Sequence, residues 1–345
     1  MEIGPDIADW LSRARKAPRL SCLLGEFSAL ASGRKGVPDF PVTLDPGLLA
    51  HDQAALDFAE VRARYAGAFN QHFVASLPYA LEEQCRFGSA IYEFGRFVSS
   101  SQGRPYNVYT LGDGPGVLAR SLSDISSGLI CTLTCSPNIE NQLAFNADRP
   151  NGSAHFFHGP FFEVTNNTLH ERGIDGFKNG FDLILEDTTF QMYGRERVEP
   201  IYLALKNLRA DGIFVVLEKF SMDDQEEFHR REVQKDESFK SRFFCQEKIE
   251  EKKLTIVKSM DQQLVTLGDM KNALDRYFSY SVVVWNSGNF YTVVSSNNKE
   301  NITRFVRCLI PPAIPVDFCY IDLPYVLIGN QEFMASFRRP ISHRS

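Results

Sequence analysis

The pattern of apolar and polar positions changes character near residue 100. Over residues 49–73 and 81–98, apolar residues recur at three- and four-residue spacing, which predicts amphipathic helices and an all-helical N-terminal section. From Tyr106 onward, short apolar runs punctuated by Gly and Asp follow at residues 107–111, 129–134, 154–157, 181–185 and 213–217. Helical stretches separate these runs. Alternating buried strands and helices predict an α/β fold with a parallel sheet covered on both faces.

A charged stretch at residues 221–258 interrupts this alternation, and its pattern is helical. It carries an embedded set of aromatic residues, namely Phe228, Phe239, Phe243 and Phe244. The stretch favours a solvated helix pair packed through one aromatic stripe. A lid that covers a site is the alternative.

The last third of the chain predicts a hairpin followed by a wrapping tail. Apolar runs at residues 280–285 and 290–295 are joined by Asn286-Ser287-Gly288-Asn289, and these residue types tolerate the positive backbone angles of tight turns. The tail from Ile302 onward contains several prolines, which predicts a segment without long helices; they are Pro311, Pro312, Pro315, Pro324 and Pro340.

Composition narrows the class of protein. The 345 residues are 43% hydrophobic and 23% charged, which indicates one large folded domain or a domain with a cap. The formal charge of −6 and the lack of a dense Lys/Arg run disfavour nucleic-acid and anionic-membrane partners. No secretory signal or membrane-spanning run is found. Seven scattered Cys without metal-ligand spacing predict reduced, mostly buried thiols in a cytoplasmic protein that holds no metal.

A glycine-rich turn is the strongest chemical signal. Gly112, Gly114 and Gly116 lie between the first apolar run and a helical stretch. Glycines at a strand-to-helix turn let a ligand approach the backbone, and they expose N–H groups at the positive end of a helix. A nucleoside-bearing ligand is the usual occupant of such a turn.

Polar residues follow the ends of the next strands. Ser136 and Asn138 come about twenty residues after the turn, where nucleotide folds place a group that meets ribose hydroxyls. The third strand ends in a segment suited to framing an adenine, with His158, Gly159 and Phe161, and the fourth runs into Glu186, Asp187 and Tyr193. Because open α/β sheets bind ligands at the carboxyl ends of their strands, these residues predict one site.

Over roughly residues 80–300 the chain resembles the class I S-adenosylmethionine-dependent methyltransferase superfamily. The resemblance rests on the loop at residues 112–116, the polar turn after the fourth strand, Ala210-Asp211-Gly212 before the fifth, and the terminal hairpin. It implies a Rossmann-like seven-stranded sheet closed by an antiparallel hairpin, with S-adenosylmethionine beside the glycine loop. The expected organisation is a helical cap region at 1–100, a binding domain at 101–300 with a helical insertion at 221–260, and a wrapping segment at 301–345.

Two positions depart from the family pattern. Thr110 stands where an acidic residue commonly helps to hold the methionine end, and Ser136 or Asn138 replaces the acid that grips the ribose. Asp113 is expected either to substitute for the missing acid or to cap the following helix. The full set of expected cofactor contacts is Tyr92, Thr110, Gly112, Asp113, Gly114, Gly116, Ser136, Asn138, Gly159, Phe161 and Glu186.

The expected reaction is in-line methyl transfer to a small molecule, for which the protein aligns the acceptor, excludes water and takes a proton. The candidate catalytic residues are His158, Glu186 and Asp187 as proton acceptors and Tyr193 as an orienting hydroxyl. Each has a structural alternative. His158 is then a hydrogen-bonded residue at a strand end, Glu186 and Asp187 cap a helix, and Tyr193 is packing.

Two other functions stay open. Thr110 also suits a cyclase or aminocarboxypropyl transferase that releases methylthioadenosine, similar to azetidine-2-carboxylate and nicotianamine synthases, since an absent carboxylate favours a free amine. A non-catalytic S-adenosylmethionine-binding module is the third possibility. The sequence identifies neither the acceptor nor the oligomeric state.

Overall fold

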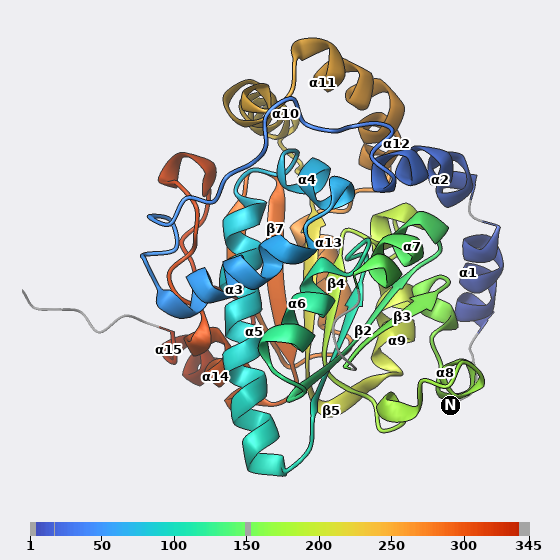
Figure 1. Cartoon of the computed structure of the whole chain (residues 1–345). Helices are drawn as coiled ribbons and strands as arrows, with labels where there is room; N and C mark the ends of the chain where they lie inside the picture. Colours follow the sequence, from blue (N-terminus) through green and yellow to red (C-terminus); the bar gives the residue numbers. More distant parts are fainter. Residues whose placement is uncertain (1–4, 17, 149–152, 338–345) are drawn as a thin grey trace, which may run out of the picture.

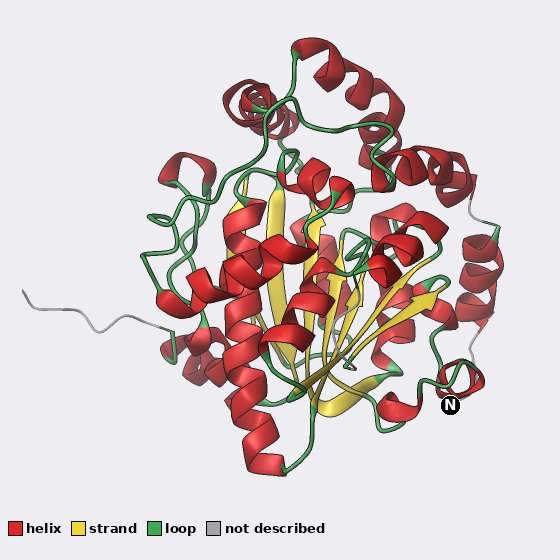
Figure 2. Ribbon diagram, viewed as in Figure 1, coloured by secondary structure: helices red, strands yellow, loops and turns green. Residues whose placement is uncertain are grey.

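A central eight-stranded sheet organises the protein in the computed structural model, which describes residues 5–16, 18–148 and 153–337. The strand order is β3-β2-β1-β4-β5-β7-β6-β8, with helices on both faces (Figures 1 and 2). The strands are β1 Tyr106–Leu111, β2 Ile130–Ser136, β3 Ala154–His158, β4 Phe181–Asp187, β5 Leu208–Lys219, β6 Tyr280–Ser287, β7 Phe290–Ser296 and β8 Tyr325–Ile328.

The topology confirms the sheet that the family resemblance implies. Strands β1 to β5 are parallel, and β7 inserts antiparallel between β5 and β6. The chain leaves β1 toward β2 on one side and returns to β4 on the other, so the order reverses between β1 and β4. Leu111 pairs with Glu186 in this register, which brings Gly112 beside Asp187. Ligands of open α/β sheets bind at such a reversal point.

The C-terminal tail differs from expectation. It adds an eighth strand, β8, which pairs antiparallel with β6, so the seven-stranded prediction is one strand short. The tail also contains a helix of ordinary length, α14 (Lys299–Cys308), which has ten residues. Ile302, Phe305 and Val306 follow helical spacing and are buried, and the helix ends before the first proline. The helix expected over 49–73 is divided into α3 (Gln53–Tyr65) and α4 (Ala68–Val74), with Gly67 as the N-cap of α4.

Each face of the sheet has its own apolar core. Helices α3, α5 (Ala80–Gln102), α6 (Val117–Ile125) and α14 cover one face, where Val108 packs. Helices α1 (Pro5–Arg15), α8 (Asn166–Glu171), α9 (Val198–Leu205) and α13 (Leu267–Leu274) cover the other, where Tyr109 and Leu111 pack. Neighbouring strand residues alternate between the two cores, as the pleat requires.

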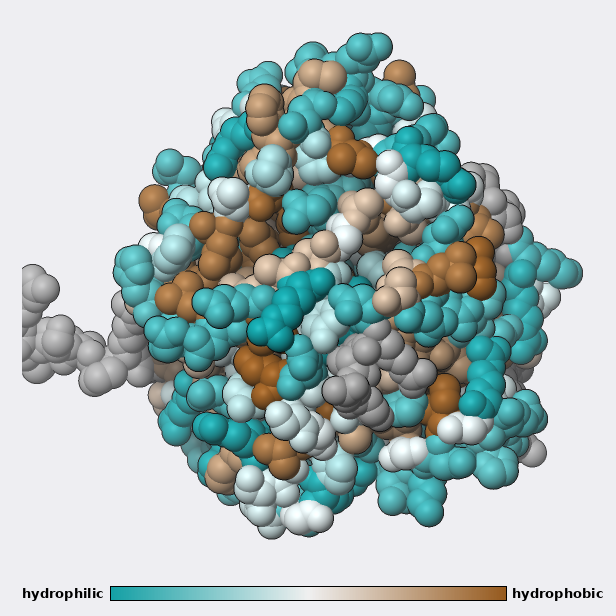
Figure 3. Space-filling view, viewed as in Figure 1, coloured by the Kyte–Doolittle hydropathy of each residue, from teal (hydrophilic) through white to brown (hydrophobic). Residues whose placement is uncertain are grey.

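The charged insertion lies over the carboxyl ends of the strands. Its helices are α10 (Gln225–Gln234), α11 (Gln246–Lys252) and α12 (Lys258–Asp261), and they sit at the top of Figure 1 beside α2 (Pro18–Ala31) and α4. Phe239, Phe243 and Phe244 of the expected aromatic stripe pack together with Phe318, whereas Phe228 lies outside this cluster, beside Lys219. Hydrophilic side chains cover much of the outer surface of this insertion (Figure 3). We call residues 221–261 the cap.

Two further expectations concern the surface and the thiols. No helix in the described part of the chain is both long and apolar enough to span a membrane. The six described cysteines are free of disulfides. Of these six, two are buried, Cys85 and Cys135, and Cys245 is exposed, so fewer of the described thiols are buried than the sequence suggested.

Candidate active site

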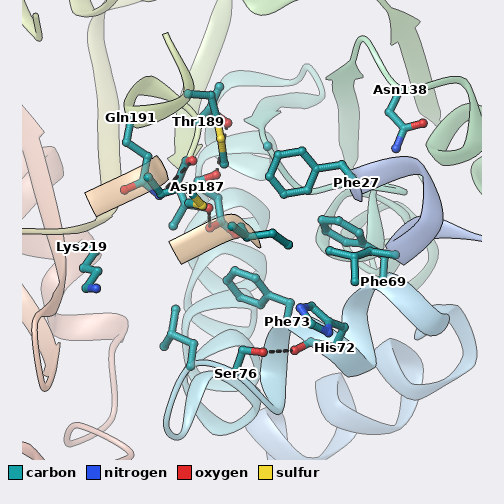
Figure 4. A pocket seen from close by; sticks show the side chains of 18 of the residues that line it. Phe27, Phe69, His72, Phe73, Ser76, Asn138, Asp187, Thr189, Gln191 and Lys219 are labelled. Atoms are coloured by element: carbon teal, nitrogen blue, oxygen red, sulfur yellow. Dashed lines mark hydrogen bonds between the residues drawn. The ribbon is translucent and has the colours of Figure 1, made fainter. Parts of the chain in front are cut away.

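A cavity of about 1410 Å³, counted with its mouth, lies between the strand ends and the cap. The glycine loop, the ends of β2 and β4, helices α2 and α4, and the cap all contribute to its wall. Figure 4 shows Asp187, Thr189 and Gln191 on one side of this space and the α4 residues on another. The insertion therefore has the packed aromatic residues of the first interpretation, and it also lies over a cavity, as the lid interpretation requires.

At each glycine of the loop, a Cβ atom would collide with a different neighbouring group. All three have positive φ, at +86°, +52° and +73° for Gly112, Gly114 and Gly116. A Cβ on Gly112 would lie 2.1 Å from the Asp187 carbonyl oxygen, and one on Gly114 would lie 2.6 Å from the Phe69 ring. Gly112 and Gly114 line the cavity, whereas Gly116 allows α6 to pack on Thr134. This division matches dinucleotide-binding turns.

Asp113 caps α6. Its carboxylate accepts hydrogen bonds from the backbone N–H groups of Leu118 and Ala119, at 3.2 and 3.0 Å. Burial raises the pKa of Asp113 to about 6, although the two N–H groups oppose this rise. The side chain does not line the main cavity, so between the two expected roles the structure shows helix capping.

Two unsatisfied polar side-chain atoms lie at the end of β2 and the start of the next helix. Ser136 Oγ accepts from Asn138 N and Asn141 Nδ2, at 3.1 and 3.0 Å. Asn138 and Asn141 contribute to the cavity wall, and Asn138 Nδ2 and Asn141 Oδ1 are buried without a hydrogen-bond partner in the described structure. One is a donor and the other an acceptor, which fits the two hydroxyls of a ribose. These side chains fit the adenosyl group that the resemblance implies.

The end of β4 brings a carboxyl group beside the glycine loop. Asp187 lines the cavity and is almost fully buried. Burial raises the pKa of its carboxyl well above the usual range, and nearby Asp113 adds to the rise. Gln191 also lines the cavity, and its buried Oε1 has no partner within the described residues. Asp187 and Gln191 therefore contribute to the cavity wall from the same turn.

Glu186 is structural in its contacts. Its Oε1 accepts from the backbone N–H groups of Thr189, at 2.5 Å, and Phe190, at 3.0 Å, which caps the short helix η3 (Phe190–Met192). The side chain is fully buried and does not line the cavity. Burial, with Glu218 nearby, raises the pKa of Glu186 well above its usual range.

We predict opposite effects for two substitutions of Glu186. Glu186→Ala removes the cap and should lower the free energy of unfolding by about 1–3 kcal/mol. Glu186→Gln keeps the accepting oxygen and removes the charge. Because the pKa of Glu186 is higher in the folded state than in the unfolded state, the wild type loses stability as pH rises through the folded-state pKa. The free energy of unfolding of Glu186→Gln, relative to that of the wild type, should therefore increase from about pH 5 to about pH 8. Urea unfolding at both pH values measures this, and a gain that shrinks with pH would contradict it.

The remaining predicted residues divide into two groups. Phe161 and Tyr193 line the cavity, and both pack against Trp10 of α1. His158 is half-buried, its Nε2 lies 3.2 Å from the Pro137 carbonyl oxygen, and it matches the structural alternative of a strand-end histidine. The residues outside the cavity wall are Tyr92, Thr110, Asp113, Gly116, His158, Gly159 and Glu186.

Sequence reasoning missed most of the wall opposite the glycine loop. Helix α4 contributes Phe69, His72 and Phe73, the turn after it contributes Ser76, and α2 contributes Phe27 (Figure 4). The spacing of the α4 set places it on one helical face, which is the available signal, but the same pattern reads as a core stripe. Four lysines complete the wall, namely Lys219, Lys235, Lys240 and Lys252.

Comparisons with known proteins found likeness only among solved structures. No protein-family model and no curated protein matches the chain. The plantazolicin methyltransferase BpumL, in complex with SAH, is 11% identical, with a TM-score of 0.43 over 73% of this chain and 99% of that one. A methyltransferase from Geobacter sulfurreducens with S-adenosyl-L-homocysteine is 15% identical, with a TM-score of 0.32 over 55% and 64%. A probable spermidine synthase from Corynebacterium glutamicum is 12% identical, with a TM-score of 0.40 over 67% and 72%. These low values do not indicate what the present chain acts on.

Proposed function

We propose that this protein is an S-adenosylmethionine-dependent transferase that moves the methyl group to a small molecule held under the cap. The observation that carries the proposal is the wall around the glycine loop: close backbone approach at Gly112 and Gly114, with unpaired polar atoms on Asn138 and Asn141. When bound, S-adenosylmethionine supplies a carbon already activated by a sulfonium. The strand order that places this wall at the reversal point supports the same assignment.

The residues of the chain have separable roles in this proposal. Asn138 and Asn141 bind the ribose, Phe161 packs beside the adenine, and Asp187 lies beside Gly112 at the methionine end. In this arrangement Asp187 lies near the position that Thr110 leaves without an acid, and it is the chain's substitute for that acid. Because its pKa is raised, Asp187 also has the capacity to donate a hydrogen bond while neutral.

The cap and the aromatic walls support a small, partly apolar acceptor. Phe27, Phe69 and Phe73 face the cavity from one side, and Met260 and Phe290 line it from the cap and β7. The cap and these side chains together exclude water and align two reactants, which is the main requirement of a displacement at an activated carbon. We further propose a cytoplasmic setting and no nucleic-acid acceptor, in keeping with the net charge of −6.

A second function has one specific observation in its favour. Among the described residues, the cavity is lined by two carboxylate side chains, Asp187 and Asp261. The pKa of Asp187 is raised by burial, and Asp261 is paired with Lys219. A substrate ammonium held there loses its proton more easily than one beside an ionised carboxylate. This environment suits ring closure of the bound cosubstrate, with release of methylthioadenosine and no second substrate.

One experiment separates these functions. The purified full-length protein is incubated with S-adenosylmethionine alone and with an added small-molecule extract, and the adenosyl products are measured. S-adenosylhomocysteine that forms only with extract supports methyl transfer. Methylthioadenosine formed without extract supports ring closure, whereas methylthioadenosine that needs extract supports aminocarboxypropyl transfer. If neither product forms but calorimetry shows binding, the protein is a binding module; without binding, the proposed function is wrong.

A further inference from the structure

Lys252 is the one lysine of the cavity wall whose nitrogen bonds only to neutral groups in the described structure. It ends α11 in the cap, is half-buried, and lines the main cavity. Its Nζ lies 2.7 Å from His72 Nε2 and 2.5 Å from Ser76 Oγ. The other three lysines of the wall form ion pairs with Glu232, Asp236 or Asp261. No described carboxylate forms an ion pair with Lys252, so its charge state is set differently from theirs.

The hydrogen bonds around Lys252 show which neighbouring atoms accept a hydrogen bond from its Nζ. His72 Nδ1 lies 2.7 Å from the Gly36 carbonyl oxygen, so that nitrogen carries the proton and Nε2 is an acceptor. The Ser76 hydroxyl donates to the His72 carbonyl oxygen at 2.6 Å, so Ser76 Oγ also accepts from Lys252. Lys252 thus donates two N–H bonds to the scaffold. In a neutral amine, the third position on Nζ is a lone pair.

The charges packed against Lys252 favour that neutral amine. Lys235 and Lys240 approach from the cap and disfavour another cation, while Asp236 is already shared among Lys235, Lys240 and Lys253. Burial is the largest cause that lowers the pKa of Lys252 well below its usual range, followed by Lys240 and Lys235. Burial likewise lowers the pKa of His72 well below its usual range, which keeps the imidazole neutral. Lys252 also borders a second cavity, where Lys35 forms ion pairs with Glu26 and Glu251.

We propose that Lys252 is the proton acceptor for the nucleophile that attacks the sulfonium carbon, with His72 and Ser76 as positioning residues. This inference rests on the transferase function proposed above, and it holds for methyl transfer and for ring closure. The hydroxyl or ammonium nucleophile gives one proton to Lys252 Nζ, which becomes an ammonium. The nucleophile's lone pair forms the new bond to carbon, and the breaking carbon–sulfur bond leaves its electron pair on sulfur.

The first test measures the titration of Lys252 in the full-length protein. Trace acetic anhydride is applied across a range of pH, and mass spectrometry gives the reactivity of each lysine. Lys252 also lines the second cavity, which gives the reagent a path, and exposed Lys258 of the same cap is the internal control. The midpoint for Lys252 should lie at least about one pH unit below that of Lys258. An equal or higher midpoint would overturn the proposal.

The second test asks whether Lys252 acts as a base or only as a charge. Consumption of S-adenosylmethionine is followed in the mixture that the wild type turns over. Lys252→Met and Lys252→Arg should both lower kcat at least about 100-fold, because neither side chain accepts a proton at neutral pH. Lys258→Met should match the wild type. If Lys252→Arg retains the activity, Lys252 is a cationic binding group and the proposed role is wrong.

Binding of S-adenosylhomocysteine shows whether only the proposed role of Lys252 is wrong or the proposed transferase function is wrong as well. Both Lys252 variants should bind it within about threefold of the wild type, since the lysine acts on the nucleophile. If the wild type neither binds nor turns over the cosubstrate, the transferase function is wrong and the role of Lys252 falls with it. If the wild type is active and the variants are equally active, only the inference about Lys252 is wrong.

Discussion

Arg197→Met is expected to lower the free energy of unfolding by about 3–5 kcal/mol at neutral pH. Arg197 Nε lies 2.9 Å from Glu218 Oε2, and both side chains are almost completely buried. The guanidinium also donates to the carbonyl oxygens of Gly194 and Gln263, so it joins the β4 loop to the segment that follows the cap. Without it, Glu218 and the neighbouring Glu186 are left as two buried carboxyls with no cation between them.

The loss from Arg197→Met should depend on pH with a defined sign. Burial already raises the pKa of Glu218, and Arg197 opposes the rise. Removal of the cation raises the folded pKa further, so the variant loses more stability as pH rises. Urea unfolding should show a larger deficit at about pH 8 than at about pH 5.5.

A paired variant controls for the loss of packing. Arg197→Met combined with Glu218→Gln removes both charges and should recover at least about half of the deficit at high pH. A single variant within about 1 kcal/mol of the wild type at pH 8, or a double variant no better than the single one, would contradict this account of the pair.

Gly112→Ala is expected to weaken binding of S-adenosylhomocysteine at least about 100-fold, because the new Cβ has no free space. It would lie 2.1 Å from the Asp187 carbonyl oxygen and 2.1 Å from Thr189 Oγ1. The backbone of the β4 loop must therefore move, and the wall of the cavity moves with it. Isothermal calorimetry measures the change in affinity.

Gly103→Ala is the matched control for backbone strain. Gly103 also has a positive φ, +63°, but a Cβ there meets no atom within 4 Å, and it ends α5 away from the cavity. Gly103→Ala should therefore reduce stability modestly and leave affinity unchanged. Equal affinities for the two variants and the wild type would show that the loop at Gly112 does not meet the ligand.

The sheet was predictable because its signals are local. Each predicted apolar run became a strand, since runs such as 181–185 are long enough to be buried and are bounded by Gly and polar turns. The positive backbone angles of the glycine loop were equally predictable, because three glycines between a strand and a helix predict a tight turn. Strand β8 was not predicted, because Tyr325–Ile328 is only four residues long and follows a proline-rich segment.

The cavity wall was only half predictable. Residues at strand ends, such as Ser136, Asn138 and Asp187, follow from topology, because parallel strands end at one edge. Asp113 and Glu186 were ambiguous, since a carboxylate beside a helix start serves a ligand or a cap equally well. The position of Lys252 in the cavity wall could not be predicted from the sequence. Its direction depends on how the cap folds back on α4, which is a tertiary contact between residues 176 to 180 positions apart.

The most direct test of the central claim is a crystal structure of the protein with S-adenosylhomocysteine. The account predicts that the ribose lies against Asn138 and Asn141 and that the amino-acid end lies beside Gly112 and Asp187. Crystals that show the compound elsewhere, or an empty cavity at saturating concentration, would contradict it.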